Sequence, residues 1–336
     1  MLNLMKLSIL LPFYNAEDTL KAAIESILSQ TYTNFELILV NNASTDQSRL
    51  IAQKFAKQDS RITIVDEARQ GIVYALNTGL SHSKASYIAR MDADDMALST
   101  RLQKQVTFLD AHPDIDLVSC LVDYQSASEG TLGYQKYVEW INTLVTPEQI
   151  ALNRFVESPL AHPSVMFRRA AVEQWGRYRQ GNFPEDYELW LRWLQAGAQM
   201  AKVTEPLLVW NDAPTRLSRN DVRYSPKEFY QTKAHYLAEW LKEKNAYYPK
   251  VWIWGAGKLS RKRARMLPPL GIQIEGFFDV ETHQRLDVSC LHFSEIPPPG
   301  KIFIISYVGN WGARDEIRQY LLNLDYQEGV DFILAS

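Results

Sequence analysis

Three aspartates fall within four residues, at Asp92, Asp94 and Asp95, directly after the short apolar run from Tyr87 to Met91. Carboxylates at this density are costly to bury unless a positive group lies among them. Two aspartates at i and i+2 beyond a strand end can point the same way and offer the hard oxygen ligands that Mg²⁺ or Mn²⁺ prefers. The alternative is a solvated acidic turn that caps the next helix. The surrounding chain decides between them.

The N-terminal part of the chain alternates short apolar runs with helical patterns. The expected strands are residues 6–11, 35–40, 61–65 and 87–91, with helices between them and near 99–109. This alternation predicts an α/β fold with a mostly parallel central sheet flanked by helices. The strand ends carry Tyr14-Asn15, Asn41-Asn42, Asp66-Glu67 and Asp92-Ala93-Asp94-Asp95. Because ligands bind beyond the carboxyl ends of parallel strands, these residues predict one binding cleft.

The pattern becomes irregular after Ile115. Strands are expected at residues 116–124, 133–140 and 164–167, and helices at 187–194 and 229–244. The polar segment 210–224, which contains Arg216 and Arg219, is predicted to be a long loop. A single histidine before an apolar strand, His162, is interpreted as a hydrogen-bonded structural residue, with an acid or acceptor contact as the alternative.

A second, smaller α/β domain is expected at the C-terminal end. The predicted domains are residues 1–245 and 249–336. A strand at 251–254 leads into Gly255-Ala256-Gly257, and Asp279 follows about twenty residues later, which is similar to the start of a Rossmann dinucleotide motif without its third glycine. Lys258 and Arg261 could hold a phosphate there. The alternative is a structural or subunit-contact domain, so a homo-oligomer remains open.

Bulk composition excludes several classes of protein. The formal net charge is −3 and no block of like charge occurs, so binding of nucleic acid is not expected. Neither a signal peptide nor a transmembrane segment is expected. The two cysteines, Cys120 and Cys290, lie far apart in apolar runs, which favours a reducing cytoplasm. Peripheral contact with the inner face of the cytoplasmic membrane remains open.

Four motifs carry a resemblance to a known family. They are Pro12-Phe13-Tyr14-Asn15, Val40-Asn41-Asn42-Ala43-Ser44-Thr45-Asp46, Met91-Asp92-Ala93-Asp94-Asp95 and Pro184-Glu185-Asp186-Tyr187-Glu188-Leu189-Trp190-Leu191-Arg192. In this order and spacing the chain, through about residue 220, resembles family 2 glycosyltransferases of the GT-A fold. The resemblance implies transfer of a sugar from a nucleotide-diphosphate donor.

The resemblance also implies roles for particular residues. Donor contacts are expected from the first two strand ends (Pro12, Tyr14, Asn15, Asn42 and Asp46), from the third (Arg69 and Gly71) and from the acidic turn (Asp92, Ala93 and Asp94). Asp92 and Asp94 would bind the metal, Mn²⁺ or Mg²⁺, while Asp95 orders the turn. Asn41-Asn42-Ala43 stands where the family often has Asp-Asp-Gly. An asparagine at the base edge fits uracil, with thymidine and guanosine donors as alternatives.

Glycosyl transfer needs two further groups. The leaving diphosphate gains negative charge, which Arg216 or Arg219 could clamp, although ordinary surface charge is the alternative. The acceptor hydroxyl must lose a proton, and Asp186 is expected to be the general base, with a helix-capping carboxylate as the alternative. We therefore predict an inverting, metal-dependent transferase that moves a sugar, most simply from a UDP-sugar, to a glycan or lipid-linked acceptor in surface polysaccharide synthesis. A non-catalytic sugar-nucleotide-binding protein and a nucleotidyltransferase are the alternatives.

Overall fold

The computed structural model describes residues 5–126, 132–212, 216–281 and 288–336. The chain forms two compact units. The first comprises Met1–Pro147, Leu160–Gly181 and Glu185–Asp221, and the second comprises Glu148–Pro159, Asn182–Pro184 and Val222–Ser336. We name them the N-terminal unit and the C-terminal unit.

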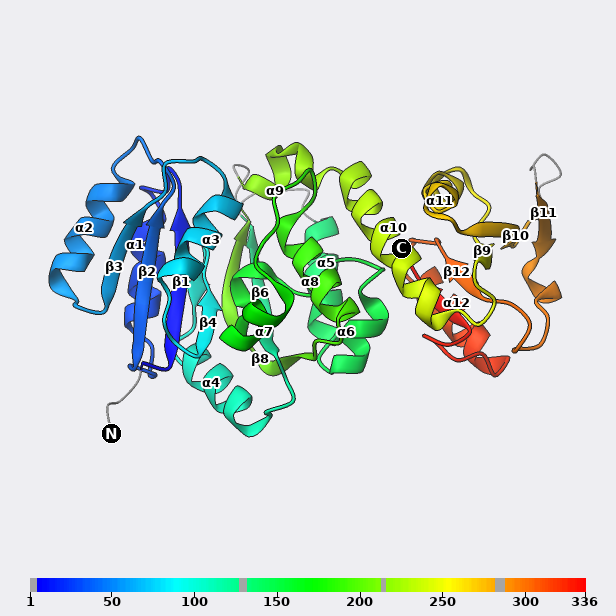
Figure 1. Cartoon of the computed structure of the whole chain (residues 1–336), viewed down its shortest axis with the longest axis horizontal. Helices are drawn as coiled ribbons and strands as arrows, with labels where there is room; N and C mark the ends of the chain where they lie inside the picture. Colours follow the sequence, from blue (N-terminus) through cyan, green and yellow to red (C-terminus); the bar gives the residue numbers. More distant parts are fainter. Residues whose placement is uncertain (1–4, 127–131, 213–215, 282–287) are drawn as a thin grey trace. The chain divides into compact units, whose positions relative to one another are not determined.

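The described part of the N-terminal unit is built on an eight-stranded sheet in the order β3-β2-β1-β4-β7-β6-β8-β5 (Figure 1). Its strands are β1 (Leu7–Phe13), β2 (Phe35–Asn41), β3 (Ile62–Asp66), β4 (Tyr87–Arg90), β5 (Met96–Ala97), β6 (Leu117–Ser126), β7 (Met166–Arg168) and β8 (Met200–Asp212). The first four strands pair in parallel, as predicted. Strand β7 runs antiparallel to β4 and β6, and β5 runs antiparallel to β8. Strands β3, β2, β1 and β4 therefore form a parallel half of the sheet, and the remaining strands form a mixed half. The acidic turn follows β4, the strand at which the two halves meet.

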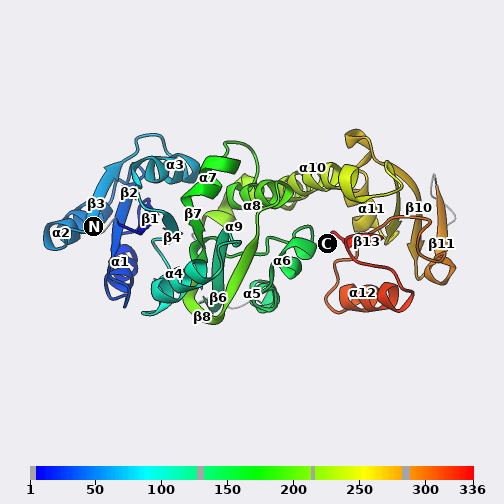
Figure 2. The same cartoon turned by 60° about the horizontal axis from the view of Figure 1, so that its bottom comes forward.

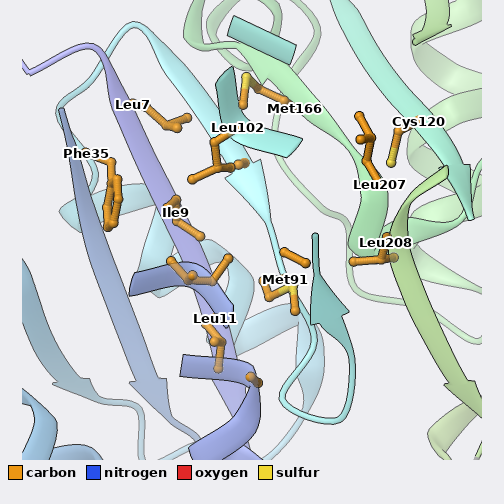
Figure 3. Packing of buried hydrophobic residues seen from close by; sticks show 14 of the residues in the cluster. Leu7, Ile9, Leu11, Phe35, Met91, Leu102, Cys120, Met166, Leu207 and Leu208 are labelled. Carbon is orange, nitrogen blue, oxygen red and sulfur yellow. The ribbon is translucent and has the colours of Figure 1, made fainter. Parts of the chain in front are cut away.

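Helices cover both faces of this sheet. They are α1 (Leu20–Leu28), α2 (Ser48–Gln58), α3 (Ile72–His82), α4 (Arg101–Ala111), α5 (Leu132–Thr143), α7 (Arg169–Trp175), α8 (Glu185–Gln195) and α9 (Leu217–Asn220), with a 3₁₀ turn η1 (His162–Ser164). Figure 2 shows α1 and α3 on opposite sides of β1 and β2. The two-residue period of a strand explains this arrangement. Leu7, Ile9 and Leu11 point into one core with α1 and α4 (Figure 3), whereas Leu10 lies against Gly79 of α3.

Three predicted elements differ from the structure. Residues 133–140 are helical, in α5, because their buried side chains, Val138 and Ile141, recur at helical spacing rather than alternating. The segment 210–224 is not one long loop: β8 continues to Asp212, and α9 and the turn η2 (Val222–Tyr224) follow, while residues 213–215 lie outside the described part. The strand predicted at 164–167 starts at Met166, after η1.

The described part of the C-terminal unit contains a five-stranded sheet in the order β11-β10-β9-β12-β13. Its strands are β9 (Lys250–Trp254), β10 (Gln273–Asp279), β11 (Ser289–His292), β12 (Ile304–Ser306) and β13 (Phe332–Leu334), and all its pairings are parallel. The helices and 3₁₀ turns are α6 (Pro147–Asn153), α10 (Pro226–Lys244), α11 (Lys258–Ala264), η3 (Pro268–Leu270), η4 (Phe293–Glu295) and α12 (Ala313–Asn323). Helices α11 and α12 lie on opposite sides of the sheet (Figure 2). This is the predicted Rossmann-like α/β arrangement.

Helix α10 belongs to the C-terminal unit, so this unit starts earlier than the predicted limit at residue 249. Lys233 of α10 donates a hydrogen bond to the carbonyl of Ala335 (3.3 Å), and the Trp240 ring meets Phe303 edge-on at 6.0 Å. The break at Tyr247-Tyr248-Pro249, on which the prediction rested, lies within the unit because α10 packs on the strands that follow it.

Candidate active site

The ends of four neighbouring strands bring the predicted polar residues to one edge of the N-terminal sheet. Strands β3, β2, β1 and β4 are adjacent and parallel, so their carboxyl ends meet there. The turns are joined directly: Asn15 Oδ1 accepts a hydrogen bond from the Thr45 amide (2.8 Å), and the Asn42 amide donates to the Phe13 carbonyl (2.9 Å). The predicted gathering of these residues on one edge is confirmed.

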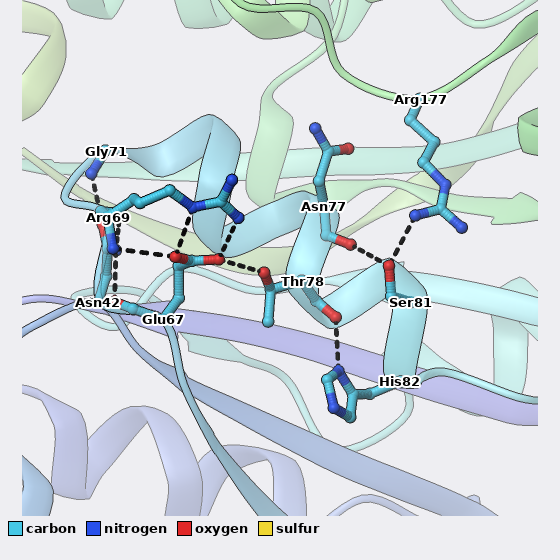
Figure 4. A network of polar contacts seen from close by, with 9 residues as sticks. All are labelled: Asn42, Glu67, Arg69, Gly71, Asn77, Thr78, Ser81, His82 and Arg177. Carbon is cyan, nitrogen blue, oxygen red and sulfur yellow. Dashed lines mark hydrogen bonds and ion pairs between the residues drawn. The ribbon is translucent and has the colours of Figure 1, made fainter.

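Asn42 organises the loop after β3 (Figure 4). Its side-chain amide donates to the carbonyl oxygens of Glu67 (3.2 Å) and Arg69 (2.8 Å), and its Oδ1 accepts from the Gly71 amide (2.8 Å). Gly71 has φ +137°, a conformation that an L side chain rarely adopts, which explains the glycine. Both amide hydrogens of Asn42 are engaged, so direct donation to a base would require one of them to be released. Its observed role is to position the loop.

Arg69 and Glu67 form the outer part of the same loop. The Arg69 guanidinium pairs with Glu67 (2.8 Å) and stacks on Tyr74, with two-thirds of its side chain exposed. Glu67 also accepts a hydrogen bond from Thr78 (2.6 Å). The pairing with Arg69 and the hydrogen bond from Thr78 lower the pKa of Glu67 to about 2. Arg69 is therefore an exposed cation whose position is fixed by Glu67 and Tyr74, at the edge where the donor is expected to bind.

The remaining residues of the first two strand ends divide into exposed and structural groups. Tyr14 is 46% exposed at this edge. Pro12 is instead buried within β1, where it lies opposite Val40 of β2 and has a structural role. Asp46 accepts hydrogen bonds from the amides of Glu17 (3.1 Å) and Ser48 (3.0 Å). Although burial opposes it, the hydrogen bonds from Ser48 and Glu17 lower the pKa of Asp46. Tyr14 is thus free to meet a ligand, and Asp46 fixes the turn.

The acidic turn brings three carboxylates together. One oxygen from each of Asp92, Asp94 and Asp95 lies within 4.8 Å of the others. Asp95 Oδ1 accepts from the Asn211 amide (2.9 Å), and the Asn211 side chain donates to the Asp94 carbonyl (2.7 Å), which ties the turn to β8. Ala93 lies between them, half-buried. As predicted, Asp95 orders the turn, but its carboxylate is also one of the three in the cluster.

Two arginines lie among these carboxylates. Arg90, at the end of β4 and 3% exposed, is ion-paired with Asp92. Arg216 Nη2 lies 3.9 Å from Asp92 Oδ2, and its guanidinium stacks on Trp210. Arg219 differs, because it is paired with Asp212 and stacks on Tyr134. Of the two arginines proposed from the sequence, the structure brings only Arg216 to the acidic turn.

The acidic turn has the chemistry of a divalent cation site. Burial and repulsion from Asp92 raise the pKa of Asp94, and burial raises that of Asp95 well above its usual value. Asp95 Oδ2 is buried and has no hydrogen-bond partner among the described residues. Three carboxyl groups face two guanidinium groups, so the acidic groups outnumber the basic ones. Carboxylate oxygens of this kind fit Mn²⁺ or Mg²⁺.

Asp186 lies in the first turn of α8. Its Oδ1 accepts from the Tyr187 amide (2.8 Å). Burial, with repulsion from Glu185, raises the pKa of Asp186 to about 7, and the positive charge of Arg90 opposes this rise. A carboxylate with a pKa near 7 is well matched to take a proton at neutral pH. Arg90 acts electrostatically on both Asp186 and Asp92, so it links the two functional groups.

His162 packs against Tyr178, Glu185 and Trp190 as a structural residue. Its Nε2 forms a hydrogen bond with the Tyr178 hydroxyl (2.8 Å), and its Nδ1 lies 4.0 Å from Glu185. Burial and the charge of Arg90 lower its pKa well below the usual value, so the ring is neutral. This geometry favours the structural interpretation of His162 over a role as a proton donor.

A model of glycosyl transferase family 2 matches residues 8–176. The chain belongs to glycosyl transferase family 2. The glycosyltransferase EpsE of Bacillus subtilis is 34% identical over 227 residues, 66% of this chain and 78% of EpsE. The O-antigen biosynthesis glycosyltransferase WbnJ of Escherichia coli is 28% identical over 244 residues, 71% of this chain and 90% of WbnJ. The structure of S. aureus TarS 1–349 in complex with UDP-GlcNAc has a TM-score of 0.56 and 16% identity, covering 79% of this chain and 71% of that one. The predicted transferase class and GT-A fold are confirmed.

One departure from the family 2 pattern has a visible structural consequence. Ala43, where the resemblance leads one to expect glycine, has φ +61°. This left-handed conformation costs a non-glycine residue roughly 1–2 kcal/mol. The turn after β2 therefore keeps its shape despite the alanine, because Asn41 Oδ1 accepts from the Ser44 amide (3.1 Å) and Asn15 holds Thr45.

The sequence did not identify Arg90 as part of this family 2 site. Its signal was an arginine within an otherwise apolar strand, directly before three aspartates. Asp186, Arg216 and Arg219 lie beyond the residues that the family model matches, so their placement rests on the structure. Among the described residues, no helix is both long and apolar enough to cross a bilayer.

Proposed function

We propose that this glycosyltransferase is inverting and metal-dependent, and that it moves a sugar from a nucleoside-diphosphate donor to a hydroxyl of a glycan or lipid-linked acceptor. The observation that carries the proposal is the combination of two groups around Arg90. One is the cluster of Asp92, Asp94 and Asp95, whose carboxyl groups lie within 4.8 Å of one another. The other is Asp186, with a pKa of about 7.

The acidic turn supplies the donor side of the reaction. Asp92 and Asp94 would hold Mn²⁺ or Mg²⁺, which when bound supplies a Lewis acid for the diphosphate leaving group. Asp95 holds the turn through Asn211, and the ion pair with Arg90 holds Asp92 in place. Arg216 lies close enough to Asp92 to clamp a phosphate oxygen beside it. Tyr14 and Arg69, both exposed at the same edge, are left to contact the nucleoside.

Asp186 supplies the acceptor side. Inversion requires a base that faces the sugar from the side opposite the leaving group, as in inverting glycosidases. Asp186 would take the proton of the attacking hydroxyl, since its raised pKa makes the carboxylate basic enough at neutral pH. Glu185 supports this role by repulsion, and α8 anchors both through the buried Trp190 and Trp193.

A UDP-sugar is the donor that we propose in first place. TarS has been solved with UDP-GlcNAc, and WbnJ is named for O-antigen biosynthesis, which supports a UDP-linked hexose or N-acetylhexosamine and a surface polysaccharide acceptor. A lipid-linked acceptor would bring the enzyme to the cytoplasmic face of the membrane.

A donor panel tests the proposal. The protein is incubated with Mn²⁺ and with UDP-, GDP- and dTDP-sugars, and the released nucleoside phosphate is identified. We expect a nucleoside diphosphate, released faster when an acceptor glycan is added, and an anomeric configuration in the product opposite to that in the donor. Formation of a nucleoside triphosphate and a sugar 1-phosphate when pyrophosphate is added would instead indicate a nucleotidyltransferase, and retention of configuration would contradict the role of Asp186.

A further inference from the structure

Three exposed apolar side chains meet at the carboxyl edge of the C-terminal sheet. Leu259 follows β9, Val280 follows β10 and Trp311 follows β12, and these three strands are adjacent and parallel. The three side chains are 57%, 66% and 50% exposed and line one cavity, so they lie close together. We name them the apolar rim. Large apolar side chains gathered on a surface mark a site of contact with a partner or a membrane.

The loops that carry the apolar rim hold one another in place. Asp279, at the end of β10, accepts hydrogen bonds from the amides of Ala256 (2.5 Å) and Val280 (2.7 Å), one on each carboxylate oxygen. A Cβ built on Gly255 would lie 3.0 Å from Val308, so the turn after β9 also packs against the loop after β12. The exposure of the rim is therefore a property of the folded edge.

Helix α11, which follows β9 (Figure 1), presents a basic face beside the apolar rim. Ser260 and Ala264 are the buried residues of this helix, and Ser260 donates a hydrogen bond to the Tyr307 carbonyl (3.1 Å). Residues three, four and seven positions apart share one face of a helix. The face turned away from the buried side carries four cations, namely Lys258, Arg261, Lys262 and Arg265. Of these, only Lys258 also lines the cavity.

The basic face has few carboxylates to balance it. None of its four cations forms an ion pair with a carboxylate of the described residues, and α11 contains no acidic residue. At the same edge, Asp315 is paired with Arg318 (3.0 Å) and Glu295 accepts a backbone amide (3.0 Å), which leaves Glu281 and Glu316. The cavity lining balances acidic with basic residues, but the outer surface beside the rim is basic. This charge is complementary to an anionic surface.

We propose that this edge of the C-terminal unit docks on an anionic lipid bilayer. The apolar rim would lie among the lipid headgroups, where tryptophan is favoured and where aliphatic side chains leave water. The basic face would lie near the lipid phosphates. With a helical rise of about 1.5 Å per residue, Lys262 and Arg265 lie at most about 6 Å and about 10 Å beyond Lys258, within roughly one screening length of the surface.

A second copy of the chain is the competing occupant of the apolar rim, and the charge of α11 disfavours it. A two-fold contact through the rim would bring the basic face of one copy close to that of the other. Like charges at such a contact repel, whereas anionic lipids attract basic residues near their surface. The inference does not rest on the donor, base or acceptor proposed for the N-terminal unit.

Co-sedimentation of the full chain with lipid vesicles tests this surface. Vesicles of phosphatidylcholine alone are compared with vesicles that contain about 30% phosphatidylglycerol. EDTA is present so that no divalent cation bridges the protein to the lipid, and neither a nucleotide sugar nor an acceptor is added. We expect binding to the anionic vesicles only, weakened at least about tenfold at about 0.5 M salt because salt screens the attraction.

Two double variants with the same change in charge supply a matched control. Lys262→Gln with Arg265→Gln removes two cations of the basic face and should weaken vesicle binding by about tenfold or more. Lys54→Gln with Lys57→Gln removes two exposed cations of α2 and should leave binding unchanged. Trp311→Ala should weaken binding by roughly fivefold, since it removes apolar area that leaves water on docking. Circular dichroism verifies that each variant is folded.

Three results would overturn the proposal. They are equal binding to the two kinds of vesicle, equal losses in the two double variants, and an unchanged affinity of Trp311→Ala for the anionic vesicles. A dimer in solution that Trp311→Ala dissociates, in a protein that binds neither kind of vesicle, would also overturn it and would assign the apolar rim to a second copy.

Discussion

The strand-end edges of the two sheets share a plan and differ in charge. Each is the carboxyl edge of parallel strands and gathers residues from several turns. The edge of the N-terminal sheet has three aspartates beside Arg90 and Arg216, so acidic groups outnumber basic ones there. The cavity lining at the edge of the C-terminal sheet has three acidic residues and three basic ones, namely Glu157, Asp279, Glu316, Lys258, Arg263 and Arg314. Both folds gather polar residues at the ends of parallel strands, but among the described residues only the first edge has clustered carboxyl groups of the kind that bind a divalent cation.

Asp186 is the proposed base, so its removal should have the largest effect on activity. Asp186→Asn keeps the size of the side chain and removes the proton acceptor. We expect kcat to fall by roughly 10²–10⁴-fold with little change in donor affinity. Measured turnover within about threefold of the native enzyme, in a folded variant, would contradict the assignment of Asp186.

The pH dependence of the same reaction sharpens this prediction. A base with a pKa of about 7 is protonated and inactive below that value, so kcat should rise tenfold per pH unit up to about pH 7 and then level off. The residual rate of Asp186→Asn should lack this rise. A native profile that is flat between pH 5 and 8 would place the base elsewhere.

Removal of a carboxylate from the acidic turn should reduce activity nearly as much as removal of the Asp186 carboxylate. Asp94→Asn removes a proposed cation ligand, and we expect kcat/KM to fall by roughly 10³-fold, since a metal ion is worth several kcal/mol of charge stabilisation. Asp95→Asn keeps the carbonyl oxygen that accepts from Asn211, so its loss should be smaller. Equal losses at the two positions would show that both carboxylates hold the cation.

Arg90 tests whether the two functional groups of the first edge are linked. Arg90→Met leaves Asp92 without its buried partner, which should destabilise the fold by about 3–5 kcal/mol in urea unfolding. Because the positive charge of Arg90 lowers the pKa of Asp186, its loss should also move the acid limb of the rate profile to higher pH.

A second buried arginine serves as the control for Arg90. Arg101 donates to Gln105 and to the Arg90 carbonyl and has no carboxylate hydrogen-bond partner among its described contacts. Arg101→Met should lower stability without moving the acid limb. A shift of equal size in both variants would show that the profile reports general loosening rather than the charge of Arg90.

The smallest expected effect is a change in donor KM, which should differ between the two arginines that follow β8. Arg216 lies beside Asp92, whereas Arg219 is paired with Asp212. Arg216→Gln should raise the donor KM by about tenfold, the loss of one hydrogen bond to a charged group. Arg219→Gln should leave that KM unchanged within about twofold. The reverse order would mean that Arg219 leaves Asp212 to bind the donor.

The parallel half of the fold was predictable because each of its strands is a continuous apolar run followed by polar residues. The acidic turn could be located because its three aspartates are adjacent in the sequence, whereas the role predicted for Asp186 came from the resemblance of its motif to family 2. The helix α5 was mistaken for a strand because its aromatic residues also suit strands, and only packing of Val138 and Ile141 separates the two. The sequence did not predict a role for Arg90, because Asp92 and Asp186 come near it together only in the folded chain. The sequence placed Asn42 at the edge of the sheet but could not predict its hydrogen-bond partners, since these are backbone groups of a loop 25 to 29 residues away.

The cation dependence proposed for the acidic turn is tested most directly by calorimetric titration of the native chain with UDP, with Mn²⁺ and then with EDTA, beside the Asp94→Asn variant. We predict a binding event that is present with Mn²⁺, lost in EDTA and lost in Asp94→Asn, because the cation would be the main link between the diphosphate and the acidic turn. Binding of UDP to the native chain and to Asp94→Asn with the same affinity and stoichiometry, with or without Mn²⁺, would contradict the account.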